Sequence, residues 1–273
     1  PLTYAELRQL AKEVEQALNA VGIGRNDRVA LVLPNGAEMA ASFVTVAACC
    51  TSAPLNPSYR ADEFEFYLND LNAKALVVEA GSSSASIEVA RKLGLSILVL
   101  HPTPAKGAGS FTLDTSSRTA AAASQPGPAQ ADDVALVLHT SGTTSRPKIV
   151  PLTQRNVCAS AQHIAASTRF TAHDRGLNVM PLFHIHGLIA GILAPLSQGG
   201  EVHCTSGFNA LKFFAQMDEV KPTWYTAVPT MHQAILSRAA NNKEVITRVP
   251  LRFIRSSSSS LPPQVLAELE VTF

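Results

Sequence analysis

VALVLHTSGTTSRPKIVPLTQRNV, residues 134–157, is the stretch of the chain that decides the fold. It opens with an apolar run at residues 134–138, which is typical of a strand buried in a parallel sheet. Five consecutive hydroxyl or glycine positions then follow His139, at Thr140, Ser141, Gly142, Thr143 and Thr144. Arg146 and Lys148 add positive charge to the end of the loop. The pattern predicts a buried strand that runs directly into a polar, cationic loop.

This loop has the composition of a polyphosphate-binding site. Small residues let backbone N–H groups approach phosphate oxygens, hydroxyls add neutral donors, and Lys148 adds a positive charge. Ligands also bind beyond the carboxyl ends of parallel strands. The loop is not a Walker loop, because its lysine follows a proline and its only glycine is Gly142. The alternative is a polar turn with a solvated lysine; the coincidence of strand, hydroxyls and two cations favours phosphate binding.

Apolar runs and helical patterns alternate along the rest of the chain. Strands are predicted at residues 28–33, 75–78, 97–100, 134–138, 177–180, 201–204, 222–228 and 252–255. Helices are predicted at residues 37–50, 62–71, 86–93, 154–168, 187–196, 210–219 and 230–240, and a capping box of Thr3 and Glu6 begins another at the start of the chain. This alternation predicts an α/β fold with doubly wound parallel sheets.

The same pattern divides the chain into two predicted subdomains. Residues 1–104 form the first, and residues 132–273 form the second, which carries the phosphate loop. Residues 105–131 are rich in Ala, Ser, Gly and Pro, with Phe111 and Leu113 as the only large apolar residues, so we expect a surface connection there. The last helical pattern stops in mid-pattern, so we expect the second subdomain to be incomplete at its C-terminus.

Composition excludes several classes of function. The 22 Lys and Arg residues nearly balance the 21 Asp and Glu residues without a run of like charge, which argues against a nucleic-acid partner. The four cysteines form no CxxC pair, which argues against a metal cluster and favours reduced thiols inside a cell. The apolar stretch at residues 39–50 is shorter than the roughly 20 residues that a membrane span needs.

Two further motifs carry candidate ligand-binding residues. His184 and His186 lie two apart, a spacing that suits zinc in a strand, but no third ligand follows, and one packed and one exposed histidine is the favoured interpretation. The serines at residues 256–260 are a flexible linker or a turn between a strand and a helix. The strand-like FIR before them and the LPP after them favour the turn, where ligands bind.

A serine hydrolase is a rival interpretation of the same loop. It would use Ser141 as the nucleophile, with His139 or His184 as the base and Asp133 to orient it. The chain lacks the GxSxG elbow around Ser141, and two neighbouring residues of one loop make a poor triad. We therefore expect the phosphate-binding function instead.

Residues 138–157, together with MPLFHIHGL at 180–188 and LRFIRSSSSSLPP at 251–263, resemble the signature motifs of the adenylate-forming superfamily. This superfamily includes acyl-CoA synthetases, luciferases and the adenylation domains of peptide synthetases. The FHIHG segment, WYTAVPT at residues 224–230 and RFIRSSSSSL at residues 252–261 most resemble the oxalate-CoA ligases. Ile149 departs from the pattern, because the superfamily generally has glycine after the loop lysine, which puts nucleotide affinity in doubt.

The resemblance implies an ATP-dependent acid-thiol ligase that uses ATP, Mg²⁺ and coenzyme A. A carboxylate would attack the α-phosphate of ATP, and the thiol of coenzyme A would then displace AMP to give an acyl-CoA. The implied substrate is oxalate or another small carboxylate. The alternatives are a medium-chain, long-chain or aromatic acyl-CoA synthetase, and a catalytically incomplete nucleotide-binding fragment. An intracellular, cytoplasmic or peroxisomal location is implied, without a membrane span.

The resemblance also assigns roles to residues. The ATP phosphates would bind at Thr140, Ser141, Gly142, Thr143, Thr144 and Lys148, with Thr144 contacting magnesium indirectly. His184, Ser258 and Ser260 would bind the acid, and Ser257 and Ser259 would lie on the adenine side. Hydroxyl and imidazole donors suit a small dianion, because its oxygens need hydrogen bonds when buried. The catalytic lysine of the superfamily would lie beyond residue 273, so we expect residues 1–273 alone to be inactive.

Overall fold

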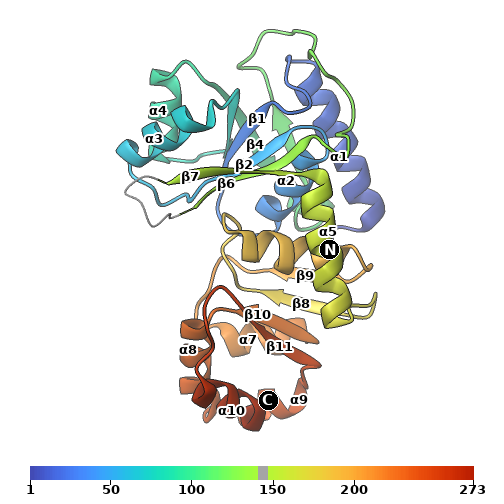
Figure 1. The fold of residues 1–273 in the computed structure, drawn as a ribbon, viewed down its shortest axis with the longest axis vertical. Coiled ribbons are helices and arrows are strands. Elements are labelled where there is room, and N and C mark those ends of the chain that lie inside the picture. The colour runs from blue at the N-terminus through green and yellow to red at the C-terminus, as the bar shows by residue number, and fades with distance from the viewer. Residues whose placement is uncertain (141–146) are drawn as a thin grey trace. The chain divides into compact units, whose positions relative to one another are not determined.

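Two separate sheets carry the fold in the computed structural model, which describes residues 1–140 and 147–273. The chain divides into two units, Pro1–Cys158 and Ala159–Phe273, and each unit contains one of the sheets. The division falls within helix α5 (Gln154–Thr168). Figure 1 shows both sheets with the helices that cover them.

The sheet of the first unit has seven strands in the order β5-β4-β3-β1-β2-β6-β7. The five strands in the middle of this order are parallel to one another, and β5 and β7 pair antiparallel at the two edges. The strands are β1 (Arg28–Val32), β2 (Thr51–Pro54), β3 (Ala75–Glu79), β4 (Ser96–Pro102), β5 (Phe111–Asp114), β6 (Val134–Thr140) and β7 (Lys148–Thr153).

Helices cover both faces of this sheet. In Figure 1, α3 (Ala61–Leu71) and α4 (Ala85–Lys92) lie on one side of the strands, and α1 (Tyr4–Asn19) and α2 (Ala37–Ala47) lie on the other. Burial on both faces explains why β1 is a continuous apolar run: alternate residues along it point to opposite helix layers. At the start of α1, Thr3 and Glu6 form the predicted capping box, which is confirmed.

The sheet of the second unit has four parallel strands in the order β11-β10-β8-β9. The strands are β8 (Arg175–Asn178), β9 (Glu201–Cys204), β10 (Trp224–Ala227) and β11 (Phe253–Ser256). Between and after them lie a π-helix (His186–Leu193), α6 (Ala194–Leu196), α7 (Phe213–Val220), α8 (Pro229–Ala239), α9 (Lys243–Arg248) and α10 (Pro263–Thr272). The parallel strands place their carboxyl ends along one edge of the sheet.

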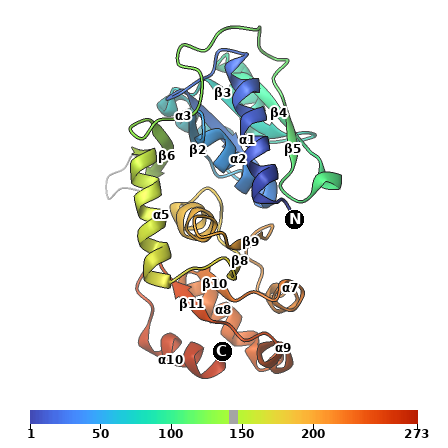
Figure 2. The same ribbon diagram turned by 90° about the vertical axis from the view of Figure 1, so that its right-hand side faces the viewer.

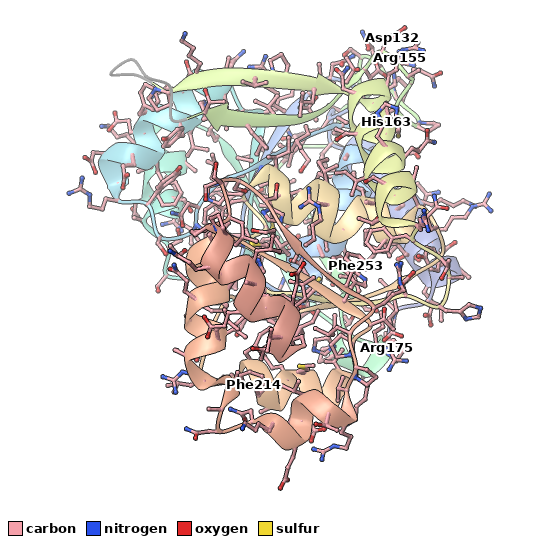
Figure 3. All side chains as sticks on the ribbon, turned by 60° about the horizontal axis from the view of Figure 1, so that its bottom comes forward. Asp132, Arg155, His163, Arg175, Phe214 and Phe253 are labelled. Atoms are coloured by element: carbon pink, nitrogen blue, oxygen red, sulfur yellow. The ribbon has the colours of Figure 1, made fainter. Side chains whose placement is uncertain are left out.

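Aromatic side chains form much of the core of this second unit. Tyr225 is fully buried and packs edge-on against Phe213, beneath α7, α8 and α9, which lie together on one side of the strands (Figure 2). On the opposite face, Trp224 stacks on Phe253, which is labelled in Figure 3, with ring centroids 5.6 Å apart. A Cβ atom on Gly176 would lie 2.5 Å from the Trp224 ring, so only glycine fits beneath it.

The predicted α/β class is confirmed, and the structure differs in the organisation of the subdomains. The strand expected to open a second subdomain at residue 132 belongs to the first sheet, where Ser52 on β2 pairs with Leu136 on β6. The predicted surface connection at residues 105–131 contains β5, because Phe111 is buried and its strand pairs with β4. Among the described residues, no helix is long and apolar enough to cross a membrane.

A buried carboxylate ties three segments of the second unit together. Asp174 is 3% exposed and accepts hydrogen bonds from the Thr171 backbone, from Thr223 Oγ1 at 3.0 Å and from Arg252 Nε at 2.8 Å. Burial alone would raise the pKa of Asp174, but the hydrogen bonds from Arg252, Thr171 and Thr223 outweigh it and lower the pKa. The charged carboxylate therefore stabilises the start of β8.

We expect Asp174→Ala to lower the free energy of unfolding by about 3 kcal/mol, because it removes a buried charged acceptor that Thr171, Thr223 and Arg252 share. Urea denaturation measures this change. The matched control is Glu201→Ala, which removes a half-exposed ion pair with Arg175 and should cost less than about 1 kcal/mol. Equal losses in the two variants would contradict the structural role of Asp174.

Candidate functional site

The phosphate loop predicted from the sequence connects the two strands of a hairpin in the first unit. β6 and β7 pair antiparallel, and Thr140 is the register partner of Lys148, which begins β7. The Thr140 hydroxyl is 3.4 Å from the carbonyl oxygen of Lys148, and both residues are exposed. The predicted phosphate ligands Ser141, Gly142, Thr143 and Thr144 lie outside the described residues. The structure thus places two of the predicted phosphate-binding residues beside each other.

His139 fastens this hairpin to helix α3. Its side chain is 6% exposed, and Nε2 lies 2.9 Å from Oδ2 of Asp70. The imidazole also packs edge-on against the Tyr67 ring, with centroids 4.7 Å apart. These contacts hold the end of β6 in place immediately before Thr140, and they give His139 a positioning role that the sequence does not reveal.

Ile149 lies on the opposite side of the hairpin strand from Lys148. Consecutive side chains of a strand point to opposite faces, and the Ile149 side chain packs against the apolar core of the first unit. Its register partner is His139, which also faces inward. The side chain at this position, where the adenylate-forming superfamily generally has glycine, therefore contributes to packing.

The hydrolase interpretation does not fit the geometry of β6. Asp133 lies just before the strand, and His139 lies six residues later, so they are about 20 Å apart along an extended chain. The Asp133 carboxylate instead accepts hydrogen bonds from the Gln130 backbone at 2.6 Å and from Asn26 at 2.7 Å. Asp133 caps a turn, and it cannot orient His139 as a catalytic base.

Four polar side chains meet in the second unit. His186 Nε2 lies 2.6 Å from Thr226 Oγ1 and 3.1 Å from Arg255 Nη1. On the other side of the imidazole, Nδ1 lies 3.0 Å from Ser258 Oγ. Thr226 and Arg255 are register partners on β10 and β11, close to the carboxyl ends of these strands. We call His186, Thr226, Arg255 and Ser258 the polar cluster.

Local structure explains how His186 reaches this position. Asn178, at the end of β8, accepts a hydrogen bond from the Met180 backbone at 3.1 Å and donates one to the carbonyl of Gly187 at 3.3 Å. The chain between them turns back, and the π-helix begins at His186. A Cβ atom on Gly187 would lie 2.4 Å from the Pro181 carbonyl, so glycine permits the close packing. π-helical segments are rare and often occur at functional sites.

The other predicted acid- and adenine-binding residues lie near the polar cluster in sequence. The serines follow β11 in a turn before α10, as predicted, and Ser258, Ser259 and Ser260 are exposed. Ser257 is half-buried and its backbone N–H bonds to the Ala227 carbonyl. His184 is exposed and lies against the Phe183 ring. The interpretation of one packed and one exposed histidine is confirmed, with His186 as the packed one.

The polar cluster combines a neutral imidazole with a half-buried cation. Burial lowers the pKa of His186 to about 4, with a further contribution from the charge of Arg255 and from His232 and His184. Burial also lowers the pKa of Arg255, which is half-buried. Within residues 1–140 and 147–273, no Asp or Glu forms an ion pair with Arg255. A partly desolvated cation of this kind favours an anionic ligand.

The sequence analysis did not identify Thr226, Arg255 or the role of His186. Thr226 lies inside an apolar strand, and Arg255 lies directly before the serine run at residues 256–260. Thr226 and Arg255 lie next to each other because β10 and β11 pair in parallel. Aligning the C-terminal ends of these two predicted strands would have brought the two residues together. Sequence spacing alone does not give that register.

The described residues do not build a magnesium site of their own. In the part of the chain with described structure, no group of three His, Cys, Asp or Glu side chains could hold a metal ion. Thr144, the predicted indirect contact to magnesium, lies outside that part. A role for magnesium therefore stays a proposal.

Stability should depend on pH through His186. The unfolded imidazole takes up a proton near its ordinary pKa of about 6.5, whereas the folded one does so only near about 4. Lowering the pH from 6.5 to 4 should therefore cost up to about 3 kcal/mol of unfolding free energy. Urea denaturation across this range should show a shallower decline in His186→Gln than in the wild type, and parallel declines would contradict the assigned burial.

Known proteins match all or nearly all of the chain. A family model described as AMP-binding enzyme matches residues 1–273. Oxalate–CoA ligase of Arabidopsis thaliana is 42% identical over 277 residues, covering 100% of this chain and 53% of that protein. Oxalate–CoA ligase of Saccharomyces cerevisiae is 36% identical, covering 91% of this chain and 49% of that protein. The chain thus spans about half the length of these curated relatives.

A solved structure shows the same fold. The crystal structure of ATP-bound MatB from Rhodopseudomonas palustris superimposes with a TM-score of 0.82 at 27% identity, covering 98% of this chain and 52% of that chain. The predicted adenylate-forming fold is confirmed by this likeness. Because the family model covers every residue, the chain belongs to the family of AMP-binding enzymes.

Proposed function

We propose that the protein is an ATP-dependent ligase that joins oxalate, or another small carboxylate, to coenzyme A through an acyl-adenylate. The observation that carries this proposal is the polar cluster at the carboxyl ends of β10 and β11. It brings the exposed hydroxyl of Ser258 and the half-buried guanidinium of Arg255 together around His186, and both groups can donate hydrogen bonds to an acid. Two relatives that share 36–42% identity are named oxalate–CoA ligases, which supports the choice of acid.

The chemistry of the polar cluster suits a small polar acid better than a fatty acid. Each carboxylate oxygen must keep hydrogen bonds when it leaves water, and the half-buried Arg255 offers charge compensation. An alkyl chain would gain nothing from these groups and would cover the half-buried charge of Arg255 without neutralising it. The cluster therefore supports an acid with polar, charged groups over one that brings an alkyl chain to this position.

The β6–β7 hairpin of the first unit is the proposed holder of the ATP phosphates. Lys148 and Thr140 lie at its described end, and both are exposed and available to a ligand. The ammonium group of Lys148 would neutralise phosphate charge, and the Thr140 hydroxyl would add a neutral donor. The predicted roles of Ser141, Gly142, Thr143 and Thr144 remain part of the proposal.

The proposed reaction has two steps. A carboxylate oxygen attacks the α-phosphorus of ATP, the bond to the β-phosphate oxygen breaks, and pyrophosphate leaves. The thiolate of coenzyme A then attacks the acyl carbon, and AMP leaves with the electron pair of the broken bond. The residues of this chain would contribute binding and charge compensation in the first step. Magnesium would arrive with the ATP triphosphate.

Lys148→Ala in the full-length protein should lower pyrophosphate exchange about 100-fold for every acid that supports it, because the phosphate charge loses its counter-charge. Exchange of labelled pyrophosphate into ATP measures this. Lys12→Ala is the control, because Lys12 is an exposed lysine on α1. Unchanged exchange in Lys148→Ala would refute the proposed role of the hairpin.

The substrate class is tested by a panel of oxalate, malonate, acetate, a fatty acid and a hydroxycinnamate. Ser258→Ala should reduce exchange most for oxalate, by about tenfold or more, because one hydrogen bond to a charged acceptor is lost. Equal loss with every acid would remove the case for a small diacid. Preference of the wild type for the fatty acid or the hydroxycinnamate would favour the alternative acyl-CoA synthetase, and ATP binding without exchange would favour an incomplete enzyme.

A further inference from the structure

The position of the proton on the neutral imidazole of His186 decides whether the Ser258 hydroxyl can donate a hydrogen bond to a ligand. A neutral imidazole carries its proton either on Nδ1 or on Nε2, and His186 has hydrogen-bond partners at both atoms. With the proton on Nε2, the imidazole would donate to Thr226, and the Ser258 hydroxyl would have to donate to Nδ1. With the proton on Nδ1, the imidazole donates to Ser258, whose own proton stays available.

Arg255 distinguishes the two forms. A guanidinium group can only donate hydrogen bonds, and Arg255 Nη1 lies 3.1 Å from His186 Nε2. A proton on Nε2 would point toward this donor, whereas an unprotonated Nε2 accepts from it. The Thr226 hydroxyl has one proton and lies 2.6 Å from Nε2 and 3.2 Å from the Arg255 carbonyl. With the proton of His186 on Nδ1, Thr226 donates to Nε2; with that proton on Nε2, Thr226 would accept from it and donate to the carbonyl. Thr226 therefore fits both forms, whereas the donor-only guanidinium fits one. The contact with Arg255 therefore selects the form with the proton on Nδ1.

The backbone conformation of Ser258 is a second, independent indication that this position serves a ligand. Ser258 has a φ of 75°, in the left-handed region that favours glycine. Serine in this conformation is strained, and glycine would relieve the strain. Residues held in such conformations cluster at ligand-binding sites. The hydroxyl is also exposed, so a ligand can reach it.

We propose that Arg255 is a positioning residue that holds the His186 proton on Nδ1, so that the Ser258 hydroxyl donates its proton to an oxygen of the bound carboxylate. This inference rests on the proposed function and names the group that recognises the acid. The chain of hydrogen bonds begins at Arg255, which only donates; His186 accepts at Nε2 and donates from Nδ1, and Ser258 accepts from His186 and donates its own proton onward. A carboxylate, which only accepts hydrogen bonds, completes it.

The proton position is measured by nitrogen NMR of histidine-labelled protein without acid or ATP. Nitrogen shifts of His186, assigned with His186→Gln, should show Nδ1 protonated in the wild type. In Arg255→Met the proton should move to Nε2, and Arg255→Lys should restore it to Nδ1 because lysine is also a donor-only cation. A proton on Nε2 in the wild type would overturn the proposal even if the variants did not fold.

Kinetics of the full-length protein give the second readout. Arg255→Met should raise the KM for oxalate by about tenfold or more and leave the KM for ATP within about twofold, because only the contact to the acid weakens. Arg255→Lys should recover most of the affinity. Arg248→Met is the matched control, because Arg248 pairs with Asp218 on the surface. An unchanged KM for oxalate in Arg255→Met would overturn the proposal.

The two proposals fail in distinguishable ways. Absence of exchange with any acid in the wild type would contradict the proposed function, whereas the proton on His186 is measured without any substrate. Exchange that is normal in the wild type and unaffected by Arg255→Met would leave the ligase function standing and remove the role of Arg255.

Discussion

The parallel register of β10 and β11 is the constraint on which the proposed acid site depends. It places Thr226 beside Arg255 at the carboxyl ends of the two strands, so that a hydroxyl and a guanidinium face the same imidazole nitrogen. A shift of one residue in either strand would turn one of these side chains to the opposite face. The buried aromatic layers on Trp224 and Tyr225 fix that register, because both rings are fully enclosed. Packing in the core thus determines hydrogen bonding at the edge.

In the first unit, too, a packed core fixes the position of polar residues at the edge of a sheet. Its apolar strands are buried between two helix layers, and this rigid sheet presents a hairpin whose polar end is exposed. His139 and Ile149 both face inward and attach the hairpin to the unit, whereas Thr140 and Lys148 are exposed. Neighbouring residues of one motif therefore have different roles: His139 and Ile149 attach the hairpin to the unit, and Thr140 and Lys148 lie on its surface.

The sequence predicted the α/β alternation well, because long apolar runs and helical spacing are local signals. It missed β7, where Pro151 interrupts the pattern, although proline is tolerated on an edge strand such as this one. The sequence also predicted a surface connection at residues 105–131, where Phe111 is in fact buried in β5. A strand of four residues is too short to give a clear alternating pattern. In the site, the family resemblance assigned acid binding to His184, which stays a prediction, and the sequence did not show which of the two histidines is buried. Which histidine turns inward depends on where the π-helix begins, and the contact to Arg255 depends on strand pairing. Neither is encoded locally.

The central claim is that a carboxylate binds at the polar cluster and accepts the proton of Ser258. A crystal structure of the full-length protein with oxalate and a non-hydrolysable ATP analogue tests it most directly. The account predicts a carboxylate oxygen within hydrogen-bonding distance of Ser258 Oγ, with His186 still in contact with both Ser258 and Arg255. Oxalate bound away from these residues, with Ser258 facing only solvent, would contradict it.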